Sequence, residues 1–254
     1  MTGGNGRADE LRANLKAVRA RIAAACQAAG RPADDVTLIA VTKTFPASDV
    51  RLLVELGVAD IGENRDQEAA RKAAECDDLD PRPRWHFVGQ LQVNKARSVV
   101  RYADVIHSVD RLRLVEVLGA RARAAGRVIT CLVQVDLGPE PGPGAERGGP
   151  GGRPPGLTER GGAAPGDVSR LADAVATEAG LTLGGVMAVA PLGAPPRPAF
   201  RRLAEVASAV RAAHPDASII SAGMTGDLEE AIAEGATHVR VGTALLGGRQ
   251  PFVR

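Results

Sequence analysis

The chain has 254 residues, a length that fits one large α/β domain or two small ones. Apolar residues make up 44% and charged residues 24%, so a sizeable hydrophobic core is available and wholesale disorder is excluded. The formal net charge is only +2 and aromatic residues make up 2%, which argues against a nucleic-acid or membrane surface. We therefore expect a small-molecule partner.

The three cysteines, Cys26, Cys76 and Cys131, form no CxxC pair, so neither a disulfide framework nor a zinc site is predicted. No His, Cys and carboxylate cluster has metal-ligand spacing, and we expect no metal site. The N-terminal segment lacks the apolar stretch of a signal peptide, and no run approaches the roughly 18 apolar residues of a membrane span. We expect a cytoplasmic protein.

Apolar residues recur at steps of three and four over 9–29, which predicts an N-terminal amphipathic helix. Beyond it, short apolar runs alternate with helical stretches, and this alternation predicts βαβ units and a parallel sheet. Eight such units close a (β/α)8 TIM barrel, so we expect a single barrel domain over 1–254 with an extra N-terminal helix. A doubly wound open sheet is the alternative. The strand-like runs are 36–42, 59–62, 84–89, 104–108, 127–136, 182–189, 217–221 and 237–242.

The segment at about 138–166 departs from this rhythm. It holds 11 Gly and 7 Pro in 29 positions, and the tetrapeptide ERGG occurs twice within it. This composition predicts a flexible, low-complexity insertion in the loop after the fifth strand rather than a linker between domains.

In a barrel of this class, functional residues lie where the strands end. Lys43 ends the first run on the same face as Ile39 and Val41, so we expect it at the barrel mouth. An amine in such a partly desolvated site favours the neutral nucleophile that attacks an aldehyde. The alternative is a rim lysine whose amine reaches water.

Two turns, 221–227 and 240–243, follow the seventh and eighth runs, and both are rich in small and hydroxyl residues. Free N–H groups at such strand-to-helix turns bind anions, and this pair of strands carries the usual phosphate site of the barrel class. Together with Lys43 the turns predict a phosphorylated aldehyde as ligand. By strand parity Arg240 faces the barrel mouth, with an ion pair to Glu63 or Asp227 as the alternative.

Seven blocks follow one another along nearly the whole chain. They are Val41–Thr44, Ile61–Arg65 with Gln67 and Glu68, Trp85–Gln92 with Asn94 and Lys95, Ile106–Asp110, Gly185–Ala188, Ser221–Thr225 with Asp227, and Val239–Thr243. In this order the blocks resemble the pyridoxal phosphate homeostasis protein family.

The resemblance implies a barrel like the N-terminal half of alanine racemase, with pyridoxal 5′-phosphate held as a Schiff base on Lys43. It also implies that hydroxyls and backbone after the last two strands take the phosphate, and that Arg240 faces the pyridine nitrogen. The cofactor contacts that it implies are Lys43, Asn64, His86, Met187, Ser221, Met224, Thr225, Arg240, Gly242 and Thr243. The 138–160 insertion, and Arg160 where the family has lysine, depart from its pattern.

Three functions remain open, and the weakest is a barrel that binds another phosphorylated metabolite without covalent chemistry. A carrier would hold pyridoxal phosphate for vitamin B6 and amino-acid homeostasis, as a monomer without catalytic residues, and pass it to apo-enzymes or amino acids. An amino-acid racemase would need a second base on the opposite substrate face, and the chain has one tyrosine, Tyr102, on the stretch before the fourth strand. An arginine beside the pyridine nitrogen also weakens the electron sink, so we expect the carrier.

Overall fold

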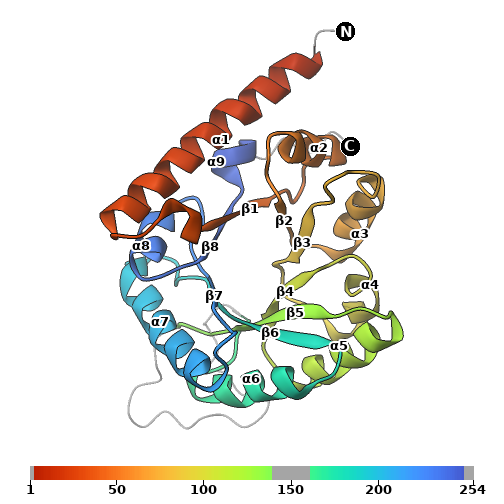
Figure 1. Ribbon diagram of the computed structural model, residues 1–254, viewed down its shortest axis with the longest axis vertical. Coiled ribbons are helices and arrows are strands. Elements are labelled where there is room, and N and C mark those ends of the chain that lie inside the picture. Colours follow the sequence, from red (N-terminus) through yellow and green to blue (C-terminus); the bar gives the residue numbers. More distant parts are fainter. Residues whose placement is uncertain (1–2, 139–160, 249–254) are drawn as a thin grey trace.

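The computed structural model describes residues 3–138 and 161–248, and these form a closed barrel of parallel strands in the order β1 to β8 (Figure 1). Strand β1 pairs with β2 on one side and with β8 on the other, which closes the sheet. The strands are β1 (Thr37–Val41), β2 (Asp60–Glu63), β3 (Arg84–Phe87), β4 (Val105–Val109), β5 (Ile129–Gln134), β6 (Leu181–Met187), β7 (Ile219–Ser221) and β8 (His238–Val241).

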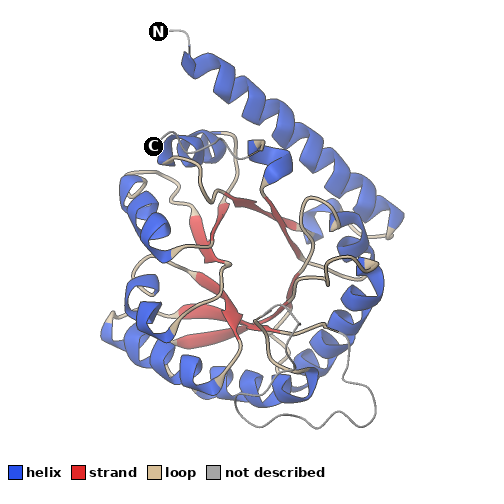
Figure 2. Cartoon of the chain, turned by 180° about the vertical axis from the view of Figure 1, so that it is seen from behind, coloured by secondary structure: helices blue, strands red, loops and turns tan. Residues whose placement is uncertain are grey.

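Helices surround the strands as an outer ring, which Figure 2 shows from behind. The α-helices are α1 (Gly3–Ala28), α2 (Ala47–Glu55), α3 (Asp66–Glu75), α4 (Ala96–Val99), α5 (Leu112–Ala124), α6 (Val168–Thr177), α7 (Pro196–Ala213), α8 (Leu228–Ala233) and α9 (Thr243–Leu246). Short 3-10 helices are η1 (Ala33–Asp35), η2 (Val93–Lys95) and η3 (Pro165–Asp167). The predicted TIM barrel is thus confirmed, and the open-sheet alternative is excluded by the β1–β8 pairing.

The extra helix α1 lies outside the ring and packs on α8 and α9 (Figure 1). Its buried face is the predicted one, since Leu11, Leu15 and Val18 are almost fully buried. The amide of Asn14 donates to the Leu245 carbonyl, which ties α1 to α9. The helix begins at Gly3 rather than at residue 9, because helical hydrogen bonding continues beyond the apolar spacing that made the prediction.

Residues 139–160 of the predicted insertion lie outside the described residues. Its last residues belong to the barrel wall, because the amide of Ala163 donates to the Gln134 carbonyl and Asp136 donates back to Ala163. The chain then enters η3, which leads into α6.

Strand parity divides the core into two layers. Outward side chains such as Ile61 and Trp85 pack against the helices, whereas Val105, Leu132 and Met187 fill the barrel interior. Apolar side chains usually occupy a barrel interior completely. Here buried polar side chains share it, and they are His86, His107, Ser221 and Arg240.

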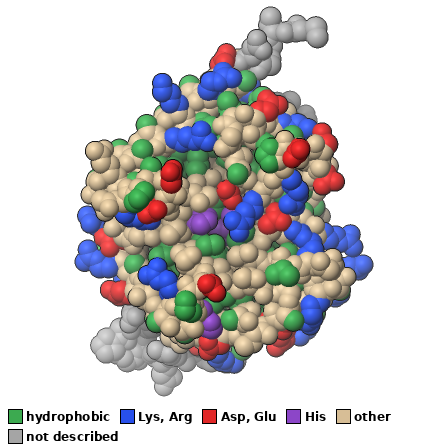
Figure 3. All heavy atoms as spheres, viewed as in Figure 1, with side chains coloured by type: hydrophobic (Ala, Val, Ile, Leu, Met, Phe, Trp, Pro, Cys, Tyr) green, Lys and Arg blue, Asp and Glu red, His purple; other side chains and the backbone are tan. Residues whose placement is uncertain are grey.

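Acidic and basic side chains are interspersed over the face in Figure 3 without a continuous basic patch, as the small net charge predicts. Within the described residues, no helix has both the length and the apolar character to cross a bilayer.

Candidate functional site

A cavity of about 380 Å³ opens where the strands end, a size typical of small-molecule sites. Its walls come from the loops after β1, β2, β3, β6, β7 and β8. The lining residues are Val41, Lys43, Thr44, Phe45, Asn64, Val88, Gly89, Val189, Met224, Thr225, Gly226, Arg240, Gly242, Thr243 and Gly247. Seven of the ten predicted contacts therefore meet around one space.

Lys43 follows β1 and is half-buried in the cavity wall. Its ammonium makes no hydrogen bond or ion pair with the described part of the chain, whereas the residues on either side of it are fixed. The carbonyl of Thr42 accepts from Lys72 Nζ at 2.6 Å, and the amide of Thr44 donates to Glu68 Oε1 at 2.5 Å. Thr44 has a positive φ of 70°, so the backbone turns sharply directly after the lysine. These two hydrogen bonds form a clamp that holds the backbone on both sides of Lys43 and leaves its amine free.

This clamp depends on a buried charge cluster outside the barrel wall, which the sequence analysis did not identify. Lys72 of α3 is only 1% exposed, and Nζ lies 2.7 Å from both Glu63 Oε1 and Glu68 Oε1. The hydroxyl of Thr42 also donates to Glu63 Oε1 at 2.5 Å. Burial raises the pKa of Glu63 and the Lys72 charge opposes this rise. The signal in the sequence was the helical spacing of Glu68 and Lys72, which places both on one face.

The turns after β7 and β8 form the part of the wall that adjoins β1. Gly223 has a φ of +87°, and the amide of Met224 donates to Asp227 Oδ1 at 2.6 Å, which fixes the first turn. The hydroxyl of Thr225 accepts from the amide of Ala244 in the second turn at 3.4 Å. Thr225, Gly226, Gly242 and Thr243 therefore present hydroxyl and backbone groups to the same space.

Arg240 lies at the cavity floor and is 5% exposed. Its Nη1 donates to the carbonyl and hydroxyl oxygens of Ser221 at 2.8 and 2.7 Å, and Nη2 donates to the Ala188 carbonyl at 2.9 Å. Neither Glu63 nor Asp227, the predicted alternative partners, bonds to it. Burial lowers the pKa of Arg240 to about 10, which still leaves it charged at neutral pH. A guanidinium has five N–H groups, so donors remain for an acceptor in the cavity.

Asn64 forms part of the wall, and its Oδ1 is buried without a hydrogen-bond partner among the described residues. A buried acceptor of this kind is satisfied by a ligand that carries a hydroxyl or N–H donor. The chain beside it requires glycine, because a Cβ on Gly89 would lie 2.2 Å from the Asn64 carbonyl oxygen.

The other three predicted contacts, His86, Met187 and Ser221, do not line the cavity. Met187 packs with Val105 and Leu132 in the barrel interior. His86 is 2% exposed and bonds to Asp60 and His107, and Ser221 is fully buried beneath the turn. All three lie on strands, whereas most of the residues that line the mouth cavity follow the strands, with Val41 of β1 and Arg240 of β8 as the exceptions.

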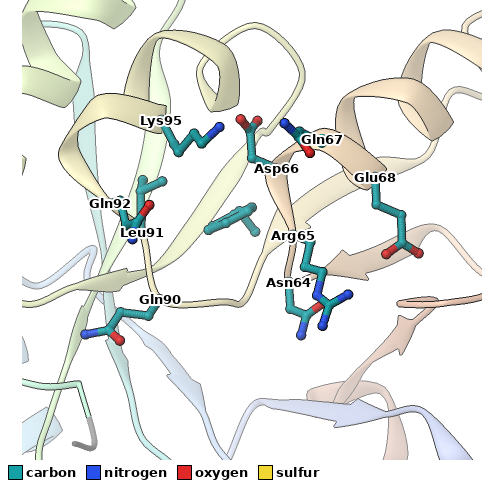
Figure 4. Close-up of a pocket in the computed structure, with 10 residues that line it drawn as sticks. Asn64, Arg65, Asp66, Gln67, Glu68, Gln90, Leu91, Gln92 and Lys95 are labelled. Atoms are coloured by element: carbon teal, nitrogen blue, oxygen red, sulfur yellow. The ribbon is translucent and has the colours of Figure 1, made fainter.

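A second cavity of about 510 Å³ adjoins the first and shares Asn64 with it (Figure 4). Lys95 on one side and Asp66 and Gln67 on the other point toward one another across it. Most of these residues belong to the family-like blocks of the sequence, from which no separate cavity was predicted. The lining residues are Asn64, Arg65, Asp66, Gln67, Glu68, Phe87, Gln90, Leu91, Gln92 and Lys95.

Residues 13–250 match the alanine racemase N-terminal domain family. The pyridoxal phosphate homeostasis protein of Mycobacterium bovis is 42% identical over 96% of this chain and 95% of its own length. This chain belongs to the pyridoxal phosphate homeostasis protein family. Two structures of PipY from Synechococcus elongatus PCC7942, without and with pyridoxal phosphate bound, are 33% identical to it. They cover 93% of this chain and 100% of PipY, with TM-scores of 0.78 and 0.75.

The resemblance seen in the sequence is thereby confirmed for the family. The alanine racemase of Streptomyces coelicolor A3(2) is 20% identical with a TM-score of 0.68, and this chain covers 58% of it. That likeness concerns the barrel fold alone.

Proposed function

We propose that this chain holds pyridoxal 5′-phosphate in the cavity at the barrel mouth and serves vitamin B6 and amino-acid homeostasis. The observation that carries the proposal is the convergence of a free lysine amine, two hydroxyl-bearing turns and a buried guanidinium on one cavity. The PipY relative, which has been solved with pyridoxal phosphate bound, supports the same ligand.

The residues fit the parts of this cofactor. The amine of Lys43 supplies the nucleophile for a Schiff base with its aldehyde. Hydroxyl and backbone groups of Thr225, Gly226 and Thr243 suit its phosphate, because N–H and O–H donors stabilise a phosphate dianion. Arg240 suits the pyridine nitrogen, and Asn64 Oδ1, which is buried without a partner among the described residues, would accept from a hydroxyl of the cofactor.

We further propose that the protein carries the cofactor without turning over amino acids. A guanidinium only donates hydrogen bonds, so Arg240 would hold a ring nitrogen that accepts one, and an unprotonated ring nitrogen would supply weaker carbanion stabilisation. Among the described residues lining the cavity there is no carboxylate, imidazole or phenol to act as a second acid or base. Tyr102 is 7% exposed and lies outside this lining.

The binding proposal is tested by the absorbance spectrum of the protein with pyridoxal phosphate, followed by borohydride reduction and peptide mass mapping. We expect the reduced adduct on Lys43 and loss of the visible band in Lys43→Ala. An adduct on Lys95, which lines the neighbouring cavity, would contradict the assignment.

The carrier proposal is tested by incubating the loaded protein with L- and D-alanine in deuterated water and assaying chirality. We expect no net inversion at metabolic rates, which are on the order of 1–1000 per second. Racemisation in that range would favour the enzyme instead. Delivery to apo-enzymes, a cytoplasmic location and a monomeric state belong to the carrier proposal, and the three free, buried cysteines agree with a reducing compartment.

A further inference from the structure

A chain of hydrogen bonds crosses the barrel interior from Arg240 to Asp60. Arg240 Nη1 lies 2.7 Å from Ser221 Oγ, and Ser221 Oγ lies 3.1 Å from His107 Nδ1. His107 Nε2 lies 2.9 Å from His86 Nδ1, and His86 Nε2 lies 2.7 Å from Asp60 Oδ1. Arg240 lines the cavity at the mouth, whereas Asp60 lines a cavity of about 450 Å³ where β1 and β2 begin.

The available donors and acceptors give this series of hydrogen bonds one direction, from Arg240 to Asp60. The guanidinium of Arg240 is a donor only, and the Asp60 carboxylate is an acceptor only. With both histidines neutral, the proton that each donates lies on the side facing Asp60, so Ser221 Oγ accepts from Arg240 and donates to His107 Nδ1. His107 then carries its proton on Nε2 and donates to His86 Nδ1. His86 in turn carries its proton on Nε2 and donates to the Asp60 carboxylate. Both histidines are neutral in this arrangement, and their burial, which lowers the pKa of each, favours the same state.

The same series of hydrogen bonds helps to offset the cost of burying the Arg240 charge. Arg240 is a buried cation whose hydrogen-bond partners are the neutral oxygens of Ser221 and Ala188, and the Asp227 carboxylate acts on it through space without bonding to it. A buried charge is costly unless an opposite charge or aligned dipoles compensate it. The hydrogen bonds align the Ser221 hydroxyl and the imidazoles of His107 and His86. Their dipoles point in one direction, from the guanidinium to the carboxylate at the other end of the barrel.

We propose that Asp60, His86, His107 and Ser221 form a one-way hydrogen-bond relay whose role is to position the Arg240 guanidinium against the ligand in the mouth cavity. They act as positioning residues, because none of them lines that cavity. The link to pyridoxal phosphate rests on the proposed function, whereas the relay itself concerns this chain alone.

The first test is made on the wild-type protein without the cofactor, and variants serve only to assign its resonances. The full chain is labelled with 15N-histidine, and the ring nitrogens are assigned by NMR at pH 7 with the help of His86→Gln and His107→Gln. We expect His86 and His107 both as the neutral tautomer protonated on Nε2. An Nδ1-protonated His107, or a doubly protonated His86, would overturn the relay.

The second test alters Asp60, the last acceptor in the series of hydrogen bonds. Asp60→Ala removes the terminal acceptor, and we expect mixed histidine tautomers, a shifted absorbance maximum of bound pyridoxal phosphate, and affinity weaker by roughly 2-fold to 30-fold. Asp60→Asn keeps an acceptor oxygen and is expected to restore all three. The matched control is Asp34→Asn, because Asp34 is exposed and lines the same cavity of about 450 Å³ as Asp60. This substitution is expected to leave the tautomers, the absorbance maximum and the affinity unchanged.

The two proposals fail separately. Wild-type tautomers and affinity in Asp60→Ala would show that the relay does not position Arg240. A wild-type protein that binds no pyridoxal phosphate would overturn the proposed function, while the tautomers measured in its absence would still decide the relay.

Discussion

At the scale of single residues, the site is a free amine between two fixed neighbours. Lys43 has no partner among the described residues, whereas Thr42 and Thr44 are held by Lys72 and Glu68. Because the backbone is already fixed, only the side chain of Lys43 would lose conformational entropy when its amine approaches an aldehyde in the cavity. Lys72 is thus the positioning group for Lys43.

Lys72→Met tests this role. The substitution leaves Glu63 without its buried counter-charge, and removing one partner of a buried pair costs about 3–5 kcal/mol of unfolding free energy. We expect that loss in urea denaturation, together with slower formation of the visible band with pyridoxal phosphate. Adding Glu63→Gln should recover part of the stability, because the uncompensated charge is then gone. Lys16→Met, an exposed position on α1, is the control, and an equal loss there would contradict the argument.

At the scale of elements, two turns act together. The turn after β7 and the start of α9 after β8 meet where Thr225 Oγ1 accepts from the Ala244 amide. The second turn also lies close to β1, since a Cβ on Gly242 would lie 3.3 Å from the Val41 carbonyl oxygen. The two turns are therefore expected to bind the phosphate as one unit.

Thr225→Val with Thr243→Val removes both hydroxyls while keeping side-chain volume. A hydrogen bond to a charged group contributes about 1.5–3 kcal/mol, so we expect pyridoxal phosphate affinity to fall at least tenfold. Pyridoxal, which lacks the phosphate, should bind the variant and the wild type alike. Fluorescence titration with both ligands measures this, and an equal loss for pyridoxal would place the hydroxyls elsewhere.

At the scale of the whole molecule, buried histidines couple stability to pH. Burial lowers the pKa of His86 and His107, and burial with the nearby His86 ring lowers the pKa of His238 to about 4. An unfolded chain takes up these protons near pH 6.5, before the folded chain does. The unfolded state therefore binds more protons below that pH, and stability falls as pH falls from about 6.5 toward 4.

We expect the unfolding free energy of the cofactor-free protein to drop between pH 6.5 and pH 5 in urea titrations. His238→Gln should make that slope shallower by about 1.4 kcal/mol per pH unit, the value of one proton. His214→Gln is the control, since His214 bonds to Asp173 outside the barrel. The same slope in wild type and His238→Gln would rule out this coupling.

The sequence alone determined the strands, the faces of their side chains and the residues that follow them. Lys43 and Arg240 were assigned to the mouth from parity with their neighbours, and both line the cavity. This works because side chains alternate strictly along a strand and the carboxyl ends of parallel strands meet at one edge.

Only the tertiary structure decided how deep each inward side chain lies and which others it meets. His86 and Ser221 were assigned to the cofactor pocket by their place in family blocks, yet both lie below it in the relay. His107 and Ser221 bond although 114 positions separate them, and Lys72 reaches the loop of Lys43 from α3, which follows the neighbouring strand β2. The stagger between neighbouring strands of a closed barrel sets the depth at which each inward side chain lies. The alternation of residues along one strand does not reveal that stagger.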